Sequence, residues 1–301
     1  MARDYRDLEP ANQYNVDYSL LGTARVEPLL RRIRNSMQGA GLYVESVKGE
    51  CNLGQHEIAF RYADALTTCD NHVIYKEGAK EIAAQENTAL TFMAKFNERE
   101  GNSCHIHISV RGNGAGYDEG DTVMVDPSDS HALSPLGKSF IAGQLAHMRE
   151  LTLWSAPNIN SYKRFVPGSF APTTVAWGHD NRTCAIRLVG HGQGLRMENR
   201  VPGGDINPYL ATAGLVAAGI DGIERELVLE SELVGNAYDA DMPKVPHTMH
   251  AALELWENSG FARSTFGDEV VDHYANMARV ELQAYNSSVT DWELRRNFER
   301  F

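Results

Sequence analysis

The chain has 301 residues, of which 43% are hydrophobic and 23% charged, and its formal net charge is −12. This composition suits a globular protein with a large buried core, and the acidic balance argues against nucleic acid or anionic membranes as general partners. The most apolar run, at 209–220, is too short to cross a bilayer. The four cysteines form no CxxC pair, so we expect reduced thiols, no structural zinc and a cytoplasmic location.

The predicted elements mix helices and strands at first and then become helical. In chain order we expect a helix over 26–40, strands over 42–47 and 56–62, a helix over 70–86, strands over 90–96 and 103–110, a helix over 134–154, strands over 173–177, 183–189 and 195–201, and helices over 207–231, 247–257, 267–285 and 289–299. No linker or repeat divides the chain. The sequence therefore predicts an α+β fold.

Two acids flank one tight connection between predicted strands. The stretch ECNLGQHE places Glu50 and Glu57 at the two ends of a Gly-containing bend. They could be solvated acids at the mouth of a hairpin, or they could gather negative charge to hold a cation. The bend alone does not decide between these readings.

Two other strands carry polar residues at alternate positions, which point to the same face. CHIHIS aligns His105, His107 and Ser109, and RMENR aligns Arg196, Glu198 and Arg200. The first could be a solvated sheet face and the second a surface charge ladder worth a few tenths of a kcal/mol per pair. A site that holds a metal and a phosphate together would need the same residues.

Arginines are concentrated in one part of this acidic chain. Arg164, Arg182 and Arg187 lie, with Arg196 and Arg200, within 37 positions. Individual ion pairs are the usual role of arginine. However, carboxylates with one imidazole suit Mg²⁺ or Mn²⁺, and arginines beside such a cation neutralise a transferring phosphoryl group. Residue chemistry alone therefore indicates metal-assisted phosphoryl transfer, without a P-loop.

At these residues the chain resembles the catalytic domain of the glutamine synthetase superfamily. The matching segments are ECNLGQHEI, KEIAAQENTALTFMAKF, GNSCHIHIS, YKRFVPG, DNRTCAIR, RMENRVPGGDINPYLA and VTDWELRRNFERF. They occur in the family's order and extend over nearly the whole chain from about residue 26. The resemblance implies one catalytic domain over residues 1–301, with a curved antiparallel sheet (a partial barrel) flanked by helices and a helical C-terminal region.

The resemblance also assigns roles to individual residues. Glu50 and Glu57 match the ligands of one divalent cation, and His105 and Glu198 match ligands of a second. The glutamate-binding positions are Gly101, Arg164 and Arg200; the phosphate-binding positions are Arg182, Arg187 and Arg200; the nucleotide-binding positions are Glu45, Tyr62, His107, Ser109 and Arg196. The implied reaction uses ATP and two Mg²⁺ or Mn²⁺ ions to activate glutamate, which an amine or ammonia then attacks. Family members assemble as rings of identical subunits, so a homo-oligomer is expected.

The sequence departs from the family pattern in two places. The family's N-terminal β-grasp domain and an E-x-E strand are not found before the matching segments, so we expect each metal site of this chain to lack one carboxylate. In addition, VPGSFAP places Phe170 where glutamine synthetases have a flap glutamate. A less polar amine is therefore expected, as in the γ-glutamyl-polyamine and γ-glutamyl-monoamine synthetase branch, unless Asp180 supplies the acid. The alternatives are a glutamine synthetase that uses ammonia and a non-catalytic paralogue or inactive fragment of this fold.

Overall fold

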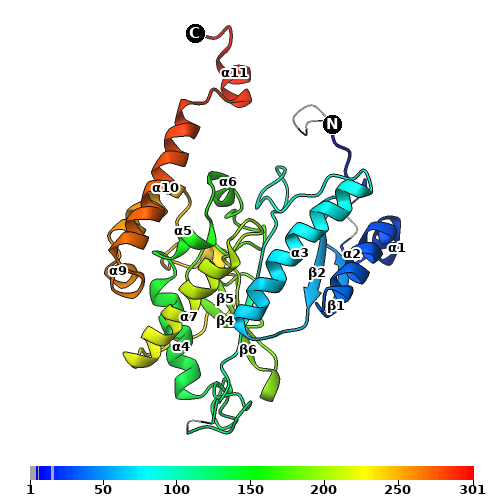
Figure 1. Ribbon diagram of the computed structural model, residues 1–301. Helices are drawn as coiled ribbons and strands as arrows, with labels where there is room; N and C mark the ends of the chain where they lie inside the picture. Colours follow the sequence, from blue (N-terminus) through cyan, green and yellow to red (C-terminus); the bar gives the residue numbers. More distant parts are fainter. Residues whose placement is uncertain (1–4, 6, 15–16, 115) are drawn as a thin grey trace. The chain divides into compact units, whose positions relative to one another are not determined.

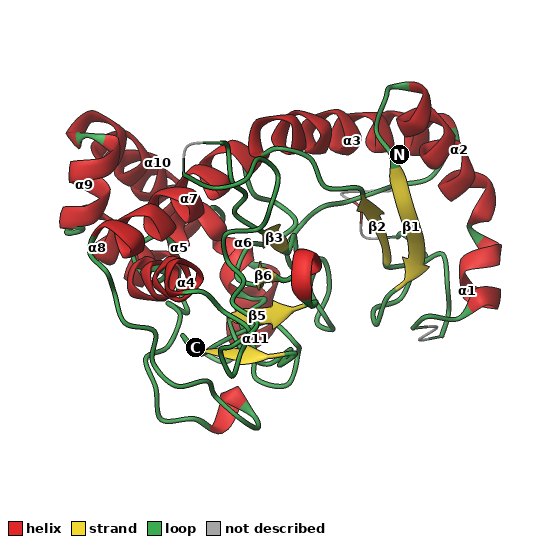
Figure 2. Ribbon diagram, turned by 90° about the horizontal axis from the view of Figure 1, so that it is seen from below, coloured by secondary structure: helices red, strands yellow, loops and turns green. Residues whose placement is uncertain are grey.

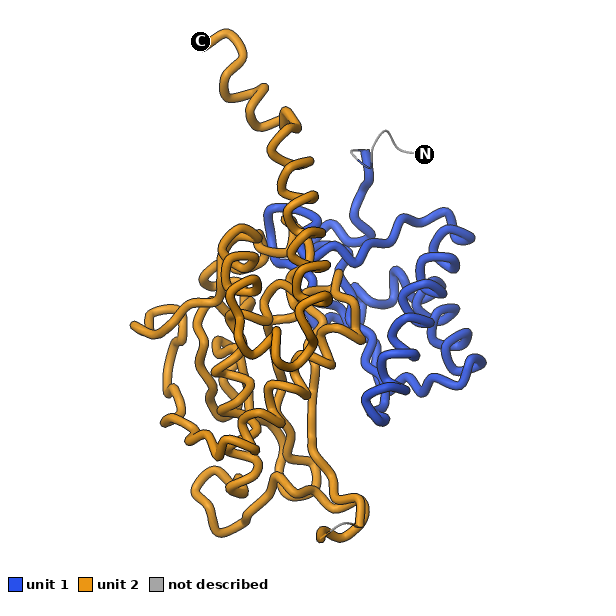
Figure 3. The backbone as a smooth tube through the Cα atoms, turned by 60° about the vertical axis from the view of Figure 1, so that its left-hand side comes forward, with its two compact units in different colours: residues 1–102 blue, residues 103–301 orange. Residues whose placement is uncertain are grey.

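The computed structural model describes residues 5, 7–14, 17–114 and 116–301 (Figure 1). The chain forms two compact units, residues 1–102 and residues 103–301 (Figure 3). We call them unit 1 and unit 2, and each is described by itself. In the part of the chain that the structure describes, no helix combines the length and apolar character needed to cross a membrane.

Unit 1 consists of a β-hairpin and helices around a small core (Figure 2). Its helices are α1 (Leu20–Arg25), α2 (Glu27–Gly39) and α3 (Ala65–Gln85), and its antiparallel strands are β1 (Val44–Gly49) and β2 (His56–Phe60). Ile33 and Met37 of α2 share a buried cluster with Ala79 and Ile82 of α3. Gly78 permits this close packing, since a Cβ at that position would lie 2.8 Å from the terminal methyl of Met37.

Unit 2 contains a mixed sheet in the order β3-β6-β5-β4. Its strands are β3 (Ile106–Ile108), β4 (Trp177–His179), β5 (Ile186–Val189) and β6 (Arg196–Asn199). The pairs β3–β6 and β5–β6 are antiparallel, whereas β4 and β5 run parallel. The sheet is therefore not antiparallel throughout, but the expected α+β class is confirmed.

The helices of unit 2 are α4 (Pro135–His147), α5 (Thr152–Ser155), α6 (Ile159–Tyr162), α7 (Pro208–Glu224), α8 (Met249–Glu257), α9 (Gly260–Phe266), α10 (Asp268–Ser287) and α11 (Asp291–Asn297), with 3₁₀ turns at Gly192–Gly194 and Ala237–Asp239. Helices α4 and α7 approach closely at glycines. A Cβ on Gly143 would lie 2.1 Å from the carbonyl oxygen of Ala218, and one on Gly222 would lie 2.1 Å from that of Ser139. The backbones can meet at these points only because side chains are absent.

A histidine ties the same two helices together. The Nε2 atom of His147 lies 2.7 Å from Oδ2 of Asp221, its Nδ1 contacts Glu150, and its ring stacks on Phe261 with the centroids 3.7 Å apart. Burial acts to lower the pKa of His147, but the two carboxylates raise it above its usual value. The charged imidazole is thus the form that this contact favours.

The predicted strand at 90–96 is wrong, and the one predicted near 173–177 is displaced, since only Trp177 of it belongs to a strand, β4. Phe92 packs beside the core of unit 1, but the backbone around it bonds to side chains instead of a neighbouring strand: the N–H of Met93 donates to Thr91 and its carbonyl accepts from Asn102. Thr174 forms only an isolated bridge, to Lys244. Apolar alternation predicted buried side chains at both places, but it could not supply a strand partner.

Helix boundaries differ most where the apolar pattern continues past a turn. The predicted helix over 134–154 is divided into α4 and α5, the one over 207–231 ends at Glu224, and α1, α6 and α9 were not predicted. By contrast, the helices predicted over 26–40 and 247–257 correspond closely to α2 and α8. Each of these two has a clear apolar stripe that ends where the helix ends.

Candidate functional site

The bend between β1 and β2 is a tight, hydrogen-bonded turn. The N–H of Glu50 donates to the carbonyl of Gln55 at 2.9 Å, and the N–H of Gln55 donates to the carbonyl of Asn52 at 3.1 Å. Gly54 has φ +68, a left-handed conformation that favours glycine. These bonds keep Glu50 and Glu57 at the two ends of one short loop.

Side chains within unit 1 anchor this bend to the segment that precedes unit 2. The amide of Asn52 donates to the side chain of Asn97 at 2.8 Å, and the amide of Gln55 donates to the carbonyl of Gly101 at 3.0 Å. Gly101, a predicted backbone contact to substrate, is therefore fixed by the acidic bend. No local sequence signal showed this contact, because Gln55 and Gly101 are 46 positions apart along the chain.

Lys48 lies at both acids of the bend. It faces Glu57 across the hairpin, and its Nζ is 2.9 Å from Oε1 of Glu57 and 3.7 Å from Oε1 of Glu50. The two carboxylates thus converge on one ammonium group of the same hairpin. The predicted nucleotide contacts Glu45 and Tyr62 belong to the same unit, and both are exposed.

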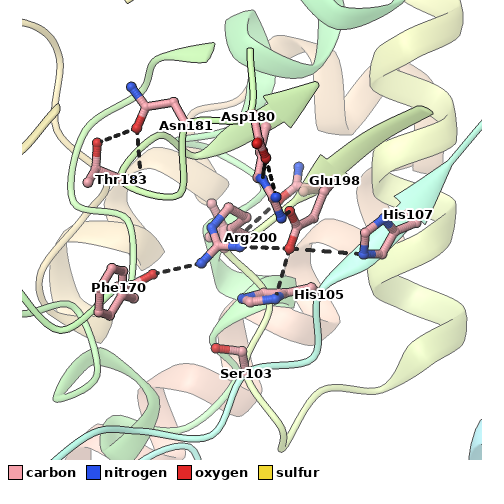
Figure 4. A network of polar contacts seen from close by, with 12 residues as sticks. Ser103, His105, His107, Phe170, Asp180, Asn181, Thr183, Glu198 and Arg200 are labelled. Carbon is pink, nitrogen blue, oxygen red and sulfur yellow. Dashed lines mark hydrogen bonds and ion pairs between the residues drawn. The ribbon is translucent and has the colours of Figure 1, made fainter. Parts of the chain in front are cut away.

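In unit 2, buried Glu198 is the centre of a polar network (Figure 4). Its Oε1 accepts a hydrogen bond from Nη1 of Arg200 at 2.7 Å and lies 3.0 Å from Nδ1 of His105, while its Oε2 accepts from Nη1 of Arg187 at 3.1 Å. Burial acts to raise the pKa of Glu198, but the hydrogen bond with His105 and the charge of Arg200 hold it well below its usual range. The carboxylate is therefore ionised at neutral pH.

His105 has the form of a metal ligand. Burial lowers its pKa to about 4 against the opposing effect of Glu198, so the imidazole is neutral. Because a carboxylate only accepts, Nδ1 carries the proton and Nε2 the lone pair. That Nε2 atom is buried and has no hydrogen-bond partner among the described residues. Imidazole nitrogens of this kind can bind Mg²⁺ or Mn²⁺. Because Nδ1 faces Glu198, the Nε2 lone pair points away from that carboxylate, and His105 and Glu198 could hold one ion together only after the imidazole ring turned over.

The expected alternation of polar residues on β3 and β6 is confirmed for the two histidines and the flanking arginines. His107 lies opposite Glu198 in the strand pairing, with its Nε2 4.0 Å from Oε1 of Glu198. Nε of Arg196 donates to Nδ1 of His107 at 3.1 Å. Ser109 follows β3 directly and is half-buried. These contacts place His107 and Arg196 side by side at the margin of the Glu198 network.

Two of the predicted arginines are buried. Arg164 donates from Nη1 to the hydroxyl of Ser103 at 3.2 Å and from Nη2 to the carbonyl of Val201, and burial lowers its pKa to about 10. Arg200 is only 4% exposed. The Nε–H groups of both arginines are buried without an acceptor among the described residues. Buried guanidinium groups with unused donors provide a site for an anion.

Arg187 connects the buried network to the surface. Besides Glu198, it bonds through Nε to Oδ1 of exposed Asp180 at 2.9 Å. This hydrogen bond holds the pKa of the Asp180 carboxyl below its usual value. Asp180 and Arg182 line an open pocket of about 580 Å³, whose other wall is formed by residues 232–235. Arg182 is exposed, in a position that solvent can reach, and its charge acts on buried Arg200.

The loop that carries Phe170 is held by its backbone. The carbonyl of Phe170 accepts a hydrogen bond from Nη2 of Arg200 at 3.2 Å, and the next carbonyl, of Ala171, accepts from the hydroxyl of Tyr238 at 3.2 Å. Figure 4 shows Phe170 on one side of Arg200 and the Glu198 contacts on the other. Phe170 has φ +57, and its side chain is 52% exposed. Nothing in the sequence indicated the role of Tyr238, because this residue is distant from Phe170 along the chain.

Unit 1 thus carries two carboxylates at a glycine bend, and unit 2 carries a buried carboxylate among guanidinium and imidazole groups on a mixed sheet. The chain belongs to the glutamine synthetase family: residues 4–297 match the model of the glutamine synthetase catalytic domain.

Several curated proteins are similar over almost the whole chain. Gamma-glutamylethanolamide synthetase GlnA4 of Streptomyces coelicolor is 66% identical and is matched over 99% of this chain and 63% of its own length. Glutamate–isopropylamine ligase of a Pseudomonas species is 38% identical, over 98% of this chain and 64% of the relative. Glutamine synthetase of Thermus thermophilus is 35% identical, over 90% and 61% respectively. The chain thus spans about three fifths of the length of these relatives.

A solved structure has the same fold. A GmaS–ADP complex superposes with a TM-score of 0.87 at 30% sequence identity, over 97% of this chain and 68% of that one. The family expected from the sequence motifs is therefore confirmed, together with its similarity to amine ligases.

Proposed function

We propose that the protein is an ATP-dependent ligase that joins the side-chain carboxylate of glutamate to an organic amine. The observation that carries this proposal is the network of Glu198, where two guanidinium groups and an imidazole with a free nitrogen meet one buried carboxylate. Arginines beside a cation site are the usual means of neutralising a transferring phosphoryl group. Relatives named as glutamate–amine ligases support the same reaction class.

The proposed reaction has two balanced steps. In the first, a side-chain oxygen of glutamate attacks the γ-phosphorus of ATP, the bond to the bridging oxygen breaks, and ADP leaves. In the second, the amine nitrogen attacks the acyl carbon, the carbon–oxygen bond to phosphate breaks, and inorganic phosphate leaves. The ammonium form of the amine loses one proton before the attack, and the second proton leaves with phosphate.

The residues proposed for each task follow from their chemistry and from the family. Mg²⁺ or Mn²⁺, held by Glu50 and Glu57 and by His105 and Glu198, would supply Lewis-acid polarisation of the phosphate oxygens. Arg182, Arg187 and Arg200 would neutralise the transferring phosphate. Glutamate would bind at Gly101, Arg164 and Arg200, and ATP at Glu45, Tyr62, His107, Ser109 and Arg196.

Phe170 and Asp180 support an organic amine over ammonia. An aromatic face can hold an alkylammonium group by a cation–π attraction of about 0.5–2 kcal/mol, with the methylenes packed on the ring. The pairing of Asp180 with Arg187 lowers the pKa of that carboxylate, so Asp180 is a weak base for bare ammonium. We also propose that the protein assembles as a ring of identical subunits, as its family does.

The test is phosphate release from ATP and glutamate with ammonium, ethanolamine, isopropylamine and longer amines, with mass spectrometry of the product. We expect an organic amine to exceed ammonium by at least about tenfold in kcat/KM, which needs only about 1.4 kcal/mol of transition-state binding. Comparable use of ammonium would indicate a glutamine synthetase. Absence of phosphate release with every amine would indicate a non-catalytic paralogue.

A further inference from the structure

The two glutamates proposed to hold a divalent cation already contact a cation from their own chain. Nζ of Lys48 lies 2.9 Å from Oε1 of Glu57 and 3.7 Å from Oε1 of Glu50. The register of the hairpin pairs Lys48 directly with Glu57. The pairing of β1 with β2 therefore places the ammonium of Lys48 beside these acids.

Further contacts surround this ammonium. The ring of Tyr18 lies 5.4 Å from Nζ of Lys48, within the range of a cation–π contact. Asp17, next to that ring, brings a carboxylate oxygen to within 4.8 Å of the ligand atoms of Glu50 and Cys51. Two carboxylates, Glu50 and Glu57, thus contact one ammonium, and a third, Asp17, lies beside Glu50, so that negative charge remains for a doubly charged ion.

We propose that Lys48 is an internal competitor of the divalent cation: its ammonium neutralises Glu50 and Glu57 when no metal is bound and leaves them when the metal binds. The inference rests on the proposed function, which assigns these two glutamates to the metal. It concerns a residue that the family motifs do not single out. Lys48 would thereby set the affinity of the bend for metal ions and its selectivity among them.

The two cations cannot share the site. Mg²⁺ or Mn²⁺ bonds to carboxylate oxygens at about 2.1 Å, so an ammonium that remained on the same oxygens would lie beside a double positive charge. The lysine is the mobile partner, because its four-carbon stem is flexible and its side chain is 35% exposed. Monovalent ions, with half the charge, would compete poorly against the ammonium. Lys48 therefore favours divalent ions over Na⁺ and K⁺.

The first experiment titrates the protein with Mn²⁺ and measures free ion by electron paramagnetic resonance. Lys48→Met removes the charge and keeps much of the stem, and we expect Mn²⁺ to bind about tenfold more tightly, equivalent to about 1.4 kcal/mol. Lys48→Arg should retain the parent affinity. Lys76→Met is the matched control, because Lys76 also belongs to unit 1 and also lies over an aromatic ring, that of Phe92. It should leave the Mn²⁺ affinity unchanged.

The second experiment needs no substitution. An amine-specific reagent is applied with and without saturating Mn²⁺, and labelling of each lysine is measured by mass spectrometry. Release of the ammonium should raise the labelling rate of Lys48 at least about threefold, a change above the scatter expected from surface contacts, and leave that of Lys76 unchanged. Equal labelling of Lys48 in both states would overturn the proposal, as would unchanged affinity in Lys48→Met.

A third variant separates this inference from the proposed function. Glu57→Gln should weaken Mn²⁺ binding if Glu57 is a ligand. If it has no effect on Mn²⁺ binding, the metal assignment of the bend is wrong and the proposed site fails with it. If Glu57→Gln weakens binding but Lys48→Met does not tighten it, only the role of Lys48 is refuted.

Discussion

Replacing Phe170 by glutamate is the most direct perturbation of the proposed amine preference. The loop should keep its position, because Arg200 and Tyr238 hold it through the carbonyls of Phe170 and Ala171 and not through the aromatic ring. Both Phe and Glu carry a Cβ, so the cost of the left-handed φ of +57 is similar for the two. The substitution thus exchanges an aromatic face for a carboxylate on a nearly unchanged backbone.

The expected size of the effect follows from the lost ring. A cation–π contact of about 0.5–2 kcal/mol corresponds to a decrease of about 2- to 30-fold in kcat/KM for the organic amine. Ammonium should gain, because a carboxylate attracts the cation and accepts its proton. The ratio of the two kcat/KM values should therefore fall toward unity in the phosphate-release assay.

Two further variants control for charge and for the backbone. Val166→Glu adds a carboxylate to the same exposed loop without removing the ring and should leave the ratio unchanged. Phe170→Gly should lower the use of the organic amine without improving ammonium, and it should raise the free energy of unfolding by about 1 kcal/mol through relief of the left-handed φ. If the amine ratio of Phe170→Glu equals that of the parent, an aromatic amine site at this loop is refuted.

Three other predictions concern charge and packing in unit 2. Arg182→Ala and Arg200→Ala should each lower kcat by about 10²–10³. Only Arg200→Ala should also lose about 2–4 kcal/mol of stability in urea unfolding, because it leaves the buried carboxylate of Glu198 poorly neutralised. Equal stability of the two variants would contradict the role of Arg200 as the buried partner of Glu198. The pKa of His147 is raised in the folded protein, so the stabilisation from its charged form is complete below the unfolded-state pKa and is lost as pH rises through the folded-state pKa. The free energy of unfolding in urea should therefore fall more at alkaline pH for the parent than for His147→Gln. Parallel pH profiles of the two proteins would exclude this linkage. Gly143→Ala should cost about 3 kcal/mol, since its Cβ would meet backbone, whereas Gly260→Ala, with open space around it, should change stability by about 0.5 kcal/mol or less; a tolerated Gly143→Ala would show that α4 and α7 can separate.

Local sequence patterns were sufficient to predict structure where the hydrogen bonds lie within one helix or between two adjacent strands. The apolar stripe of α2 predicted a helix close to the observed Glu27–Gly39. The alternation in CHIHIS and RMENR predicted that His105 and His107 share one face and that Arg196, Glu198 and Arg200 share another, and the structure brings His105 and His107 to Glu198. In a β-strand the direction of the side chains alternates with a period of two residues, so side chains on the same face of two neighbouring strands meet when the strands pair. Motif order then supplied the family.

Distance along the chain limited the rest. No local pattern shows that Tyr238 reaches the carbonyl of Ala171, because that contact depends on the path of the segments between them. Burial of Arg200 was missed for a similar reason: arginine is usually exposed, and its partner Glu198 neutralises it inside the unit. The strand expected at 90–96 failed because alternation predicts buried side chains but cannot identify a hydrogen-bonding neighbour.

Asp180, Arg187, Glu198 and Arg200 form a row of alternating charges that runs from an exposed carboxylate to a buried guanidinium. Each inner member is neutralised by its neighbours, so a substitution at one position changes what its neighbours can tolerate. Double-mutant cycles along the row should therefore give coupling energies well away from zero. Over evolutionary time, these positions should covary: a relative that replaces Asp180 by a neutral residue would need a compensating change at Arg187 or beyond it to keep the same charge around Glu198.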